Sequence, residues 1–201
     1  MPKIVDRELR RRELAAAVWR VIIRDGVAAV SIRSVAAEAG WSSGALRHYF
    51  STRAELLAFA CELVIEQVTD RVSGMRQTGG LREAVGDILL ETMPVDANRH
   101  TESSIAFAFL ALGLGDPELA RIQRIHFTSM YDLCLNLIRQ LDAAGLLAPH
   151  RVPLESLAHR LHAIVDGLTV HVLAGQLRPA EMVAQLNAYL DELTAPSRPG
   201  S

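Results

Sequence analysis

The stretch from Ser31 to Phe50 constrains the fold of this 201-residue chain more than any other, because it reads as two short helices joined by a tight turn. Ser31 stands where its hydroxyl can accept a hydrogen bond from a free backbone N–H at a helix start. Gly40 stands where a left-handed residue ends a helix, which costs least for glycine. Between them, apolar residues recur at the spacing of one helical face: Ile32, Val35, Ala36 and Ala39. The spacing predicts a helix over 32–39.

A second short helix is predicted directly after this turn. Trp41 anchors the turn, and Ser42 or Ser43 can cap the helix that follows. The outward residues are small at the N-terminal end and then basic and hydrogen-bonding, which suits a helix whose N-terminal end enters the major groove of DNA. The buried side is predicted to be Leu46, Tyr49 and Phe50, and the outward side Ser43, Gly44, Ala45, Arg47 and His48.

Helix pairs of this shape also occur in proteins that bind nothing, so the flanking residues matter. A basic amphipathic helix precedes the pair, and Tyr49-Phe50-x-x-Arg53-x-Glu55-Leu56-Leu57 follows it. From Ile32 to Leu57 the chain resembles the TetR/AcrR family of bacterial one-component transcription regulators, whose members commonly read I-A-x-x-A-G-V-S-x-G-x-L-Y-x-Y/H-F-x-x-K-x-x-L-L. Here Trp41 stands where a small aliphatic residue is usual, Arg47 where tyrosine is usual, and Arg53 where lysine is usual.

Charge is distributed unevenly along the chain. Residues 1–53 carry ten Lys and Arg against five Asp and Glu, whereas residues 54–201 carry eleven against eighteen. A basic N-terminal quarter joined to an acidic remainder is typical of a nucleic-acid reader with a separate regulatory body. Chance clustering would give the same imbalance, and without the motif the two explanations are evenly matched.

The apolar spacing of the whole chain predicts an all-α fold of about nine helices, with no strand pattern. Thr52 and Glu55 are expected to form a capping box, and the apolar run from Ile105 to Leu114 predicts a helix buried on every side. Besides the helix pair, helices are expected at 6–25, 53–75, 81–93, 97–112, 117–144, 153–175 and 179–193. The predicted domains are a three-helix helix-turn-helix DNA-binding domain (1–53), a helical effector-binding and dimerisation domain (54–194) and a disordered tail (195–201).

The last two predicted helices are amphipathic, so they can cover their own core or pair with a second copy in a four-helix bundle. The C-terminal half resembles the betaine-operon repressor type of the family, which favours pairing. A homodimer also suits DNA reading, because two recognition helices one DNA turn apart read a palindrome. The residues expected at the dimer interface are Leu157, Leu161, Ile164, Leu168, Val172, Val183, Leu186 and Leu190.

Residue types and the resemblance together suggest which side chains touch DNA. Arg33 would reach a base edge or a phosphate, and Arg47 would pair with guanine or with phosphate. The run Arg10-Arg11-Arg12 is either a solvated face or a further phosphate contact. Phosphate contacts set affinity and register, whereas base contacts set sequence preference. The predicted DNA-binding residues are Arg33, Ser43, Gly44, Ala45, Arg47, His48, Tyr49 and Arg53, the last three as phosphate contacts.

The resemblance also implies an effector pocket inside the helical body. Such pockets are mostly apolar with a few polar groups, and core packing is the competing explanation for every candidate. The candidates are Phe107, Phe109, Leu110, His126, Phe127, Met130, Tyr131, Cys134, His162 and Asp166. His159, His162 and Asp166 share one helical face, a spacing that can bind a metal, but a polar stripe explains it better, and we predict no metal and no cofactor.

Several classes of protein are disfavoured. The motifs G-x-S-x-G, H-E-x-x-H and the P-loop are absent, so no enzyme is predicted. No apolar stretch is long enough for a membrane span, and the N-terminus does not read as a signal peptide. Cys61 and Cys134 are isolated and are predicted to be buried thiols of a reduced cytoplasmic protein, with a redox switch as the alternative.

These patterns predict a cytoplasmic, ligand-responsive transcriptional regulator, foremost a repressor. It would bind a palindromic operator in double-stranded DNA as a homodimer and leave it when an unidentified small-molecule effector binds. The alternative is a helical small-molecule carrier or scaffold without a DNA function, and a helical enzyme comes third. Salt-dependent affinity for a palindrome separates a regulator from a carrier.

Overall fold

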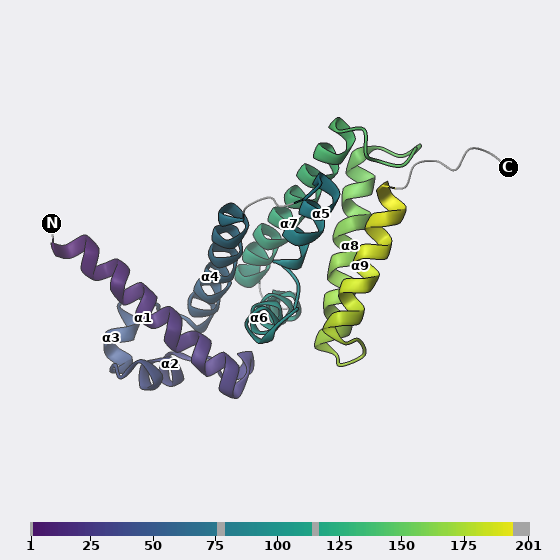
Figure 1. Ribbon diagram of the computed structural model, residues 1–201. Helices are drawn as coiled ribbons and strands as arrows, with labels where there is room; N and C mark the ends of the chain where they lie inside the picture. Colours follow the sequence, from purple (N-terminus) through teal and green to yellow (C-terminus); the bar gives the residue numbers. More distant parts are fainter. Residues whose placement is uncertain (1, 76–78, 114–116, 195–201) are drawn as a thin grey trace. The chain divides into compact units, whose positions relative to one another are not determined.

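The computed structural model of this protein describes residues 2–75, 79–113 and 117–194, and every regular element within those ranges is helical (Figure 1). The predicted all-α fold is confirmed. The chain forms two compact units, Met1–Gln67 with Ile105–Gln123 and Val68–Ser104 with Arg124–Ser201. The predicted domain boundary after residue 53 lies inside the first unit, since that unit continues along the next helix as far as Gln67. The tail at 195–201 lies outside the described residues. No helix in the described ranges is long and apolar enough to cross a membrane.

The first unit contains α1 (Pro2–Asp25), η1 (Val27–Ala29), α2 (Ile32–Ala39), α3 (Ser43–Arg47) and the first part of α4 (Arg53–Gly74). The 3₁₀ turn η1 was not predicted. The apolar stripe of α1 is buried as expected, and α1 packs against α2 and η1, while α2 packs against α3. The buried residues of α1 are Leu14, Ala17, Val18, Val21 and Ile22, and Val35, Leu46, Leu56 and Leu57 of the later helices are buried as well.

The turn between α2 and α3 forms as its sequence predicts. The Ser34 N–H donates to Ser31 Oγ at 3.0 Å, and the Ser31 N–H donates to Ser34 Oγ at 2.9 Å. These bonds satisfy backbone groups that the first turn of a helix leaves free. Gly40 ends α2 at φ 70°, and the Trp41 N–H donates to the Ala36 carbonyl at 2.8 Å. A side chain at Gly40 would be strained in this left-handed conformation.

The start of α4 differs in one detail from the predicted capping box. The Glu55 N–H donates to Thr52 Oγ1 at 3.0 Å, as expected. The Glu55 carboxylate, however, accepts from the Ser51 N–H at 2.5 Å and from the Ser51 hydroxyl. These hydrogen bonds stabilise the ionised form and lower the pKa of Glu55. The cap therefore extends one residue further back than the pattern indicates.

The second unit contains α5 (Leu81–Leu90), the first half of α6 (Ala97–Gly113), most of α7 (Pro117–Ala143), α8 (Leu154–Leu173) and α9 (Pro179–Thr194). α5 ends at Leu90, earlier than the predicted residue 93, because the chain turns there and buries Met93 in the core. α8 and α9 run side by side in opposite directions (Figure 1). Fully buried residues from four of these helices form the core: Leu89, Leu137, Ile138, Leu141, Leu161, Leu186 and Leu190.

A cluster of charged side chains joins the end of α4 to α5 and α6 within the second unit. Arg71 donates to both oxygens of the Glu102 carboxylate, at 2.8 and 2.5 Å, and its Nε donates to Glu91 at 2.8 Å. Arg99 contacts the second oxygen of Glu91 at 3.1 Å. Glu102 is only 4% exposed, so its charge depends on Arg71 for compensation.

α6 does not meet the expectation of burial on every side. Ile105 is fully buried, but Ala106, Phe107, Ala108 and Leu110 are half-buried. The side chain of Phe109 and those from 111 onward in α6 lie outside the described ones. A continuous apolar run indicates that a helix avoids water. It does not show that the side chains of the same protomer bury every face of that helix.

Candidate nucleic-acid interface and effector site

Three of the five residues predicted to face outward at helix α3 are exposed. Ser42, rather than Ser43, caps it, because Ser42 Oγ accepts from the Ala45 N–H at 3.1 Å. Leu46 is fully buried and anchors the helix to the core. Gly44, Arg47 and His48 are exposed, whereas Ser43 and Ala45 are half-buried. The exposed face combines a glycine without a side chain, a cation and an imidazole.

Tyr49 was expected on the buried side, and that expectation was wrong. α3 ends at Arg47, so helical periodicity no longer decides the direction of Tyr49, which is 38% exposed. The Tyr49 ring meets the edge of Trp41 with centroids 5.5 Å apart. Phe50 does turn inward and packs against Phe59 at 5.0 Å.

Trp41 also holds one of the arginines of α1. The guanidinium carbon of Arg10 lies 5.3 Å from the centre of the Trp41 ring, a distance at which the cation is attracted by the ring face. Arg10 therefore has a partner inside the first unit. The side chains of Arg11 and Arg12 lie outside the described ones.

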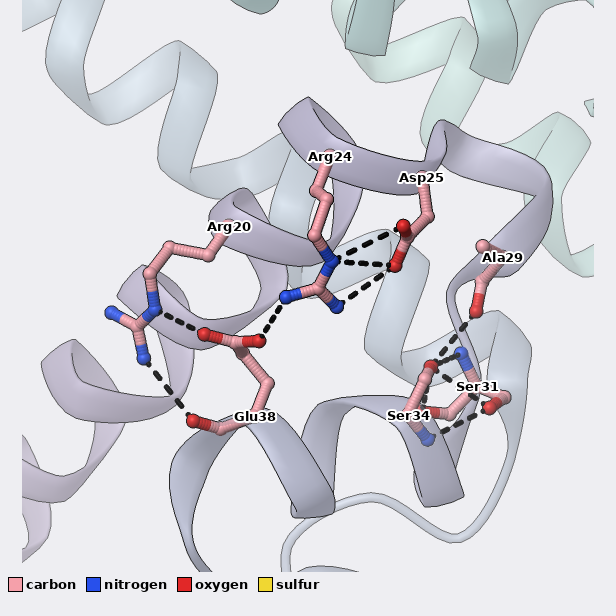
Figure 2. Close-up of polar contacts among 7 residues, drawn as sticks. All are labelled: Arg20, Arg24, Asp25, Ala29, Ser31, Ser34 and Glu38. Atoms are coloured by element: carbon pink, nitrogen blue, oxygen red, sulfur yellow. Dashed lines mark hydrogen bonds and ion pairs between the residues drawn. The ribbon is translucent and has the colours of Figure 1, made fainter.

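Two further arginines of α1 hold α2 in place (Figure 2). The Glu38 carboxylate accepts from Arg20 Nε and from Arg24 Nη1, each at 2.6 Å. Arg24 also contacts Asp25 at 2.8 Å. The two guanidinium groups lower the pKa of Glu38. These cations are thus engaged in joining two helices of the first unit.

The remaining predicted DNA contacts divide into two groups. Arg33 and Arg47 are exposed and make no hydrogen bond or ion pair with any other described residue. Arg53, in contrast, donates from Nε to the Val30 carbonyl at 2.8 Å. Sequence spacing did not indicate this contact, because the partners are 23 residues apart.

The candidate effector residues of the second unit centre on a pair formed by buried His162 and half-buried Asp166. His162 Nε2 lies 3.3 Å from Asp166 Oδ2, and the Phe127 ring lies 5.5 Å from the imidazole of His162. Burial raises the pKa of Asp166, an effect that nearby His162 opposes. Burial, together with nearby His162, lowers the pKa of His126. The group brings together a carboxyl, two imidazoles and an aromatic ring.

The other candidates do not all join this pair. Tyr131 packs on His159 at 4.3 Å, and Met130 and Tyr131 are partly buried against the core. Cys134 is fully buried, so core packing explains it. Phe107 and Leu110 belong to the first unit, and the side chain of Phe109 lies outside the described ones. Among the described residues no group of His, Cys, Asp and Glu, including His159 with His162 and Asp166, is arranged to hold a metal ion.

The predicted dimer interface needs a correction for five of its eight residues. Leu157, Leu161, Val172, Leu186 and Leu190 are at most 6% exposed and lie in the core of the protomer. A side chain already covered by its own chain gains nothing from a partner, so these residues hold α8 and α9 in place. Ile164, Leu168 and Val183 are half-buried.

The opposite face of α8, which the sequence reading passed over, is exposed, and after Arg160 it carries a stripe of uncharged residues. Four residues spaced three or four apart lie on it: Ala163, Gly167, Val170 and Ala174. On α9, Ala184 and Ala188 are exposed at the same kind of spacing. Solvent-facing helix surfaces are usually charged, so the absence of charge in this α8 stripe was the available signal. We call these six residues the small-residue face.

Comparison with known proteins matches both parts of the chain. Residues 14–59 match the model of the TetR family of bacterial regulatory proteins, and residues 81–195 match the C-terminal domain of BetI-type transcriptional repressors. The transcriptional regulator PksA of Bacillus subtilis is 42% identical over 89% of this chain and 85% of its own. The regulator BetI of Vibrio parahaemolyticus is 30% identical over 96% of each chain.

Solved structures share the fold. A transcriptional regulator from Rhodococcus sp. Rha1 is 27% identical, covers 91% of this chain and 95% of its own, and superposes with a TM-score of 0.77. A regulator from Saccharomonospora viridis, solved in complex with choline, is 22% identical over 92% of this chain and 96% of its own, with a TM-score of 0.77. Helix order and sequence thus agree along nearly the whole chain.

Proposed function

The chain belongs to the TetR family of DNA-binding transcriptional regulators, with a BetI-type C-terminal domain, and we propose on that premise that it works as a homodimer on a palindromic operator from which a small-molecule effector releases it. The observation that carries the proposal is α3, a capped and anchored helix whose exposed face bears Gly44, Arg47 and His48. Regulators of this family act as dimers and are typically repressors, and they are not enzymes. Family membership sets aside the carrier alternative. We expect the protein to work in the cytoplasm, where bacterial DNA is found.

On DNA, we propose that α3 enters the major groove. Gly44, with Ser43 and Ala45 beside it, would allow close approach to the groove floor. Arg47 is available to pair with guanine, because no described residue engages its guanidinium. Arg33 would reach a base edge or a phosphate, and His48 and the exposed Tyr49 would contact the DNA backbone. Base contacts would then set the sequence, and backbone contacts the affinity.

For the dimer, we propose the small-residue face of α8 and α9 as the contact. Side chains no larger than valine let helices of two protomers approach closely and pack in a four-helix arrangement. An isologous interface of this kind places two copies about a two-fold axis. That symmetry matches a palindromic operator.

For the effector, we propose the neighbourhood of His162 and Asp166. A carboxyl whose pKa burial raises would be stabilised in its ionised form by a ligand that brings a positive charge or a hydrogen-bond donor. The Phe127 ring beside it would suit a cation as well. Choline, which is bound in the Saccharomonospora viridis regulator, is the first compound to test. A ligand that binds the DNA-released conformation better than the DNA-bound one lowers the affinity for the operator.

The first experiment measures fluorescence anisotropy of DNA from the region upstream of the gene, over a salt series and against scrambled DNA of the same composition. Specific binding that weakens steeply with salt is expected, since each neutralised phosphate contributes about −0.9 to the slope of log K against log salt. If the upstream DNA binds no better than scrambled DNA, the test is repeated with sequences selected from a random pool. Failure to select any sequence contradicts the proposal.

A further inference from the structure

Arg53 makes contacts that a phosphate-neutralising residue does not need. Its Nε donates to the Val30 carbonyl at 2.8 Å, and its Nη2 lies 3.3 Å from the Val27 carbonyl and 3.4 Å from the Ala28 carbonyl. Ser34 Oγ donates to the remaining carbonyl of this segment, that of Ala29, at 2.8 Å (Figure 2). Side chains from α4 and α2 therefore engage every carbonyl from 27 to 30.

This segment determines where α2 begins. It contains η1, its last residue Val30 is fully buried, and the next residue is Ser31, which caps α2. α2 leads through the Gly40 turn into α3. Arg53 is the first residue of α4, so its guanidinium ties the start of α4 to the start of the helix pair. All these residues lie in the first unit.

The chemistry of arginine suits this task. A guanidinium spreads its donors over a rigid planar fork, whereas an ammonium carries all three N–H groups on one nitrogen. The contacts to three carbonyls use two nitrogens of the fork. A lysine would keep the charge but could not hold the same carbonyls in the same geometry.

We propose that Arg53 is a positioning residue, which fixes the α2–α3 pair on the start of α4 through the carbonyls of residues 27, 28 and 30. Its contribution to DNA binding is the placement of α3 and not the neutralisation of a phosphate. The inference rests on the proposed DNA-reading function, because placement of α3 matters only if α3 contacts DNA.

The test compares Arg53→Lys and Arg53→Met with the wild-type protein on a duplex selected by the wild-type protein from a random pool. We expect both variants to bind about tenfold more weakly, with the wild-type slope of log K against log salt. A phosphate ligand behaves differently: lysine would retain the affinity, and methionine would make the slope shallower by about one. That pattern overturns the proposal.

Two further readings keep the outcome decisive. The Val30 N–H, which donates to the Val27 carbonyl at 3.2 Å, should exchange with solvent deuterium faster in both variants than in the wild type. Unchanged exchange contradicts the positioning role of Arg53. A lower Tm with unchanged DNA affinity contradicts it as well. Arg151→Met, at an exposed position in the loop before α8, is the matched control and should change neither reading. If the wild-type protein selects no DNA, the proposed function fails. The exchange measurement still tests whether Arg53 holds the carbonyls of residues 27, 28 and 30.

Discussion

At the scale of single residues, the arginines of the first unit carry the same charge but differ in what they are free to do. Arg20 and Arg24 share the Glu38 carboxylate, and Arg53 is engaged by backbone carbonyls. Arg33 and Arg47 have no such contact among the described residues, and both are exposed. A count of positive charges in this segment therefore overstates the number of cations that can meet DNA.

Arg47→Ala should weaken binding to the selected operator by about 1–3 kcal/mol if Arg47 reads a base. The reason is the loss of a paired contact to a base edge, which random DNA does not offer in the same register. Anisotropy with operator and random DNA measures the difference, with Arg151→Ala, at an exposed loop position, as the control. An equal loss on both DNAs would make Arg47 a backbone contact instead.

The two cysteine thiols should be unreactive in the folded protein. Burial raises the pKa of Cys61 to about 11 and that of Cys134 to about 12, so both are protonated at neutral pH, and the thiolate is the reactive form. A colorimetric thiol assay should report no rapid reaction before denaturant is added and two thiols after it. Rapid native reaction of either thiol would reopen the redox-switch alternative.

At the scale of helices, ion pairs join neighbouring elements within each unit. Glu38 binds α2 to α1 on the surface of the first unit (Figure 2). Arg71 binds the end of α4 to α5 and α6 in the second unit, where Glu102 is almost completely buried. The Glu38 ion pairs and the Arg71 ion pairs differ in burial. The stability that each set contributes should therefore respond differently to pH and to substitution.

The Glu38 contact should contribute stability that depends on pH. Because its folded pKa is lowered, the contribution is present above the pKa of an unfolded glutamate and is lost as the pH falls through the folded value. Glu38→Gln should therefore have a lower Tm than the wild type at neutral pH, and the difference should vanish in acid. A difference in Tm that does not change with pH would contradict this account.

Arg71→Met should destabilise the second unit by up to about 3 kcal/mol, because it leaves the Glu102 carboxylate buried without its partner. That value is at the lower end for buried pairs, since the Arg71 side chain is 31% exposed. Urea unfolding measures the change. The double variant Arg71→Met with Glu102→Met should be more stable than Arg71→Met alone, because no unpaired charge remains. Simple addition of two losses would show that the pair is not coupled.

At the scale of the whole molecule, the proposed function requires a second copy of the chain. The leucines of α8 and α9 are used in the core of the protomer, and the small-residue face is left exposed. Burial of that face in a dimer would remove from water the uncharged residues that a single protomer cannot cover.

Gly167→Arg should convert the dimer to a monomer, because an arginine side chain cannot be accommodated where two helices approach closely. Mass measured by light scattering should halve, and operator affinity should fall with it, while the helical circular dichroism signal stays. Ala143→Arg, exposed at the end of α7, is the control and should remain dimeric. A dimeric Gly167→Arg protein would exclude the small-residue face as the contact.

Local sequence was sufficient to predict the α-helices of this protein, but neither the 3₁₀ turn η1 nor the long-range partners of the helices. Helix α2 could be predicted from residues close together in the chain, since Ser31, Gly40 and the apolar spacing act within one helix. The buried side of α1 followed from the same 3.6-residue period. The outward residues of α3 followed as well, because they occupy one short helix.

Contacts between distant residues were decided only by tertiary structure. The period of α8 marks Leu161 as buried, but it does not say whether the cover comes from α9 of the same chain or from a second copy. Arg53 resembles any solvent-facing cation until the fold brings it to carbonyls 23 to 26 residues earlier. The helical spacing did not predict the exposure of Tyr49, because α3 ends two residues before it. Helical spacing records which face of an element avoids water, and only the packed chain determines what covers that face.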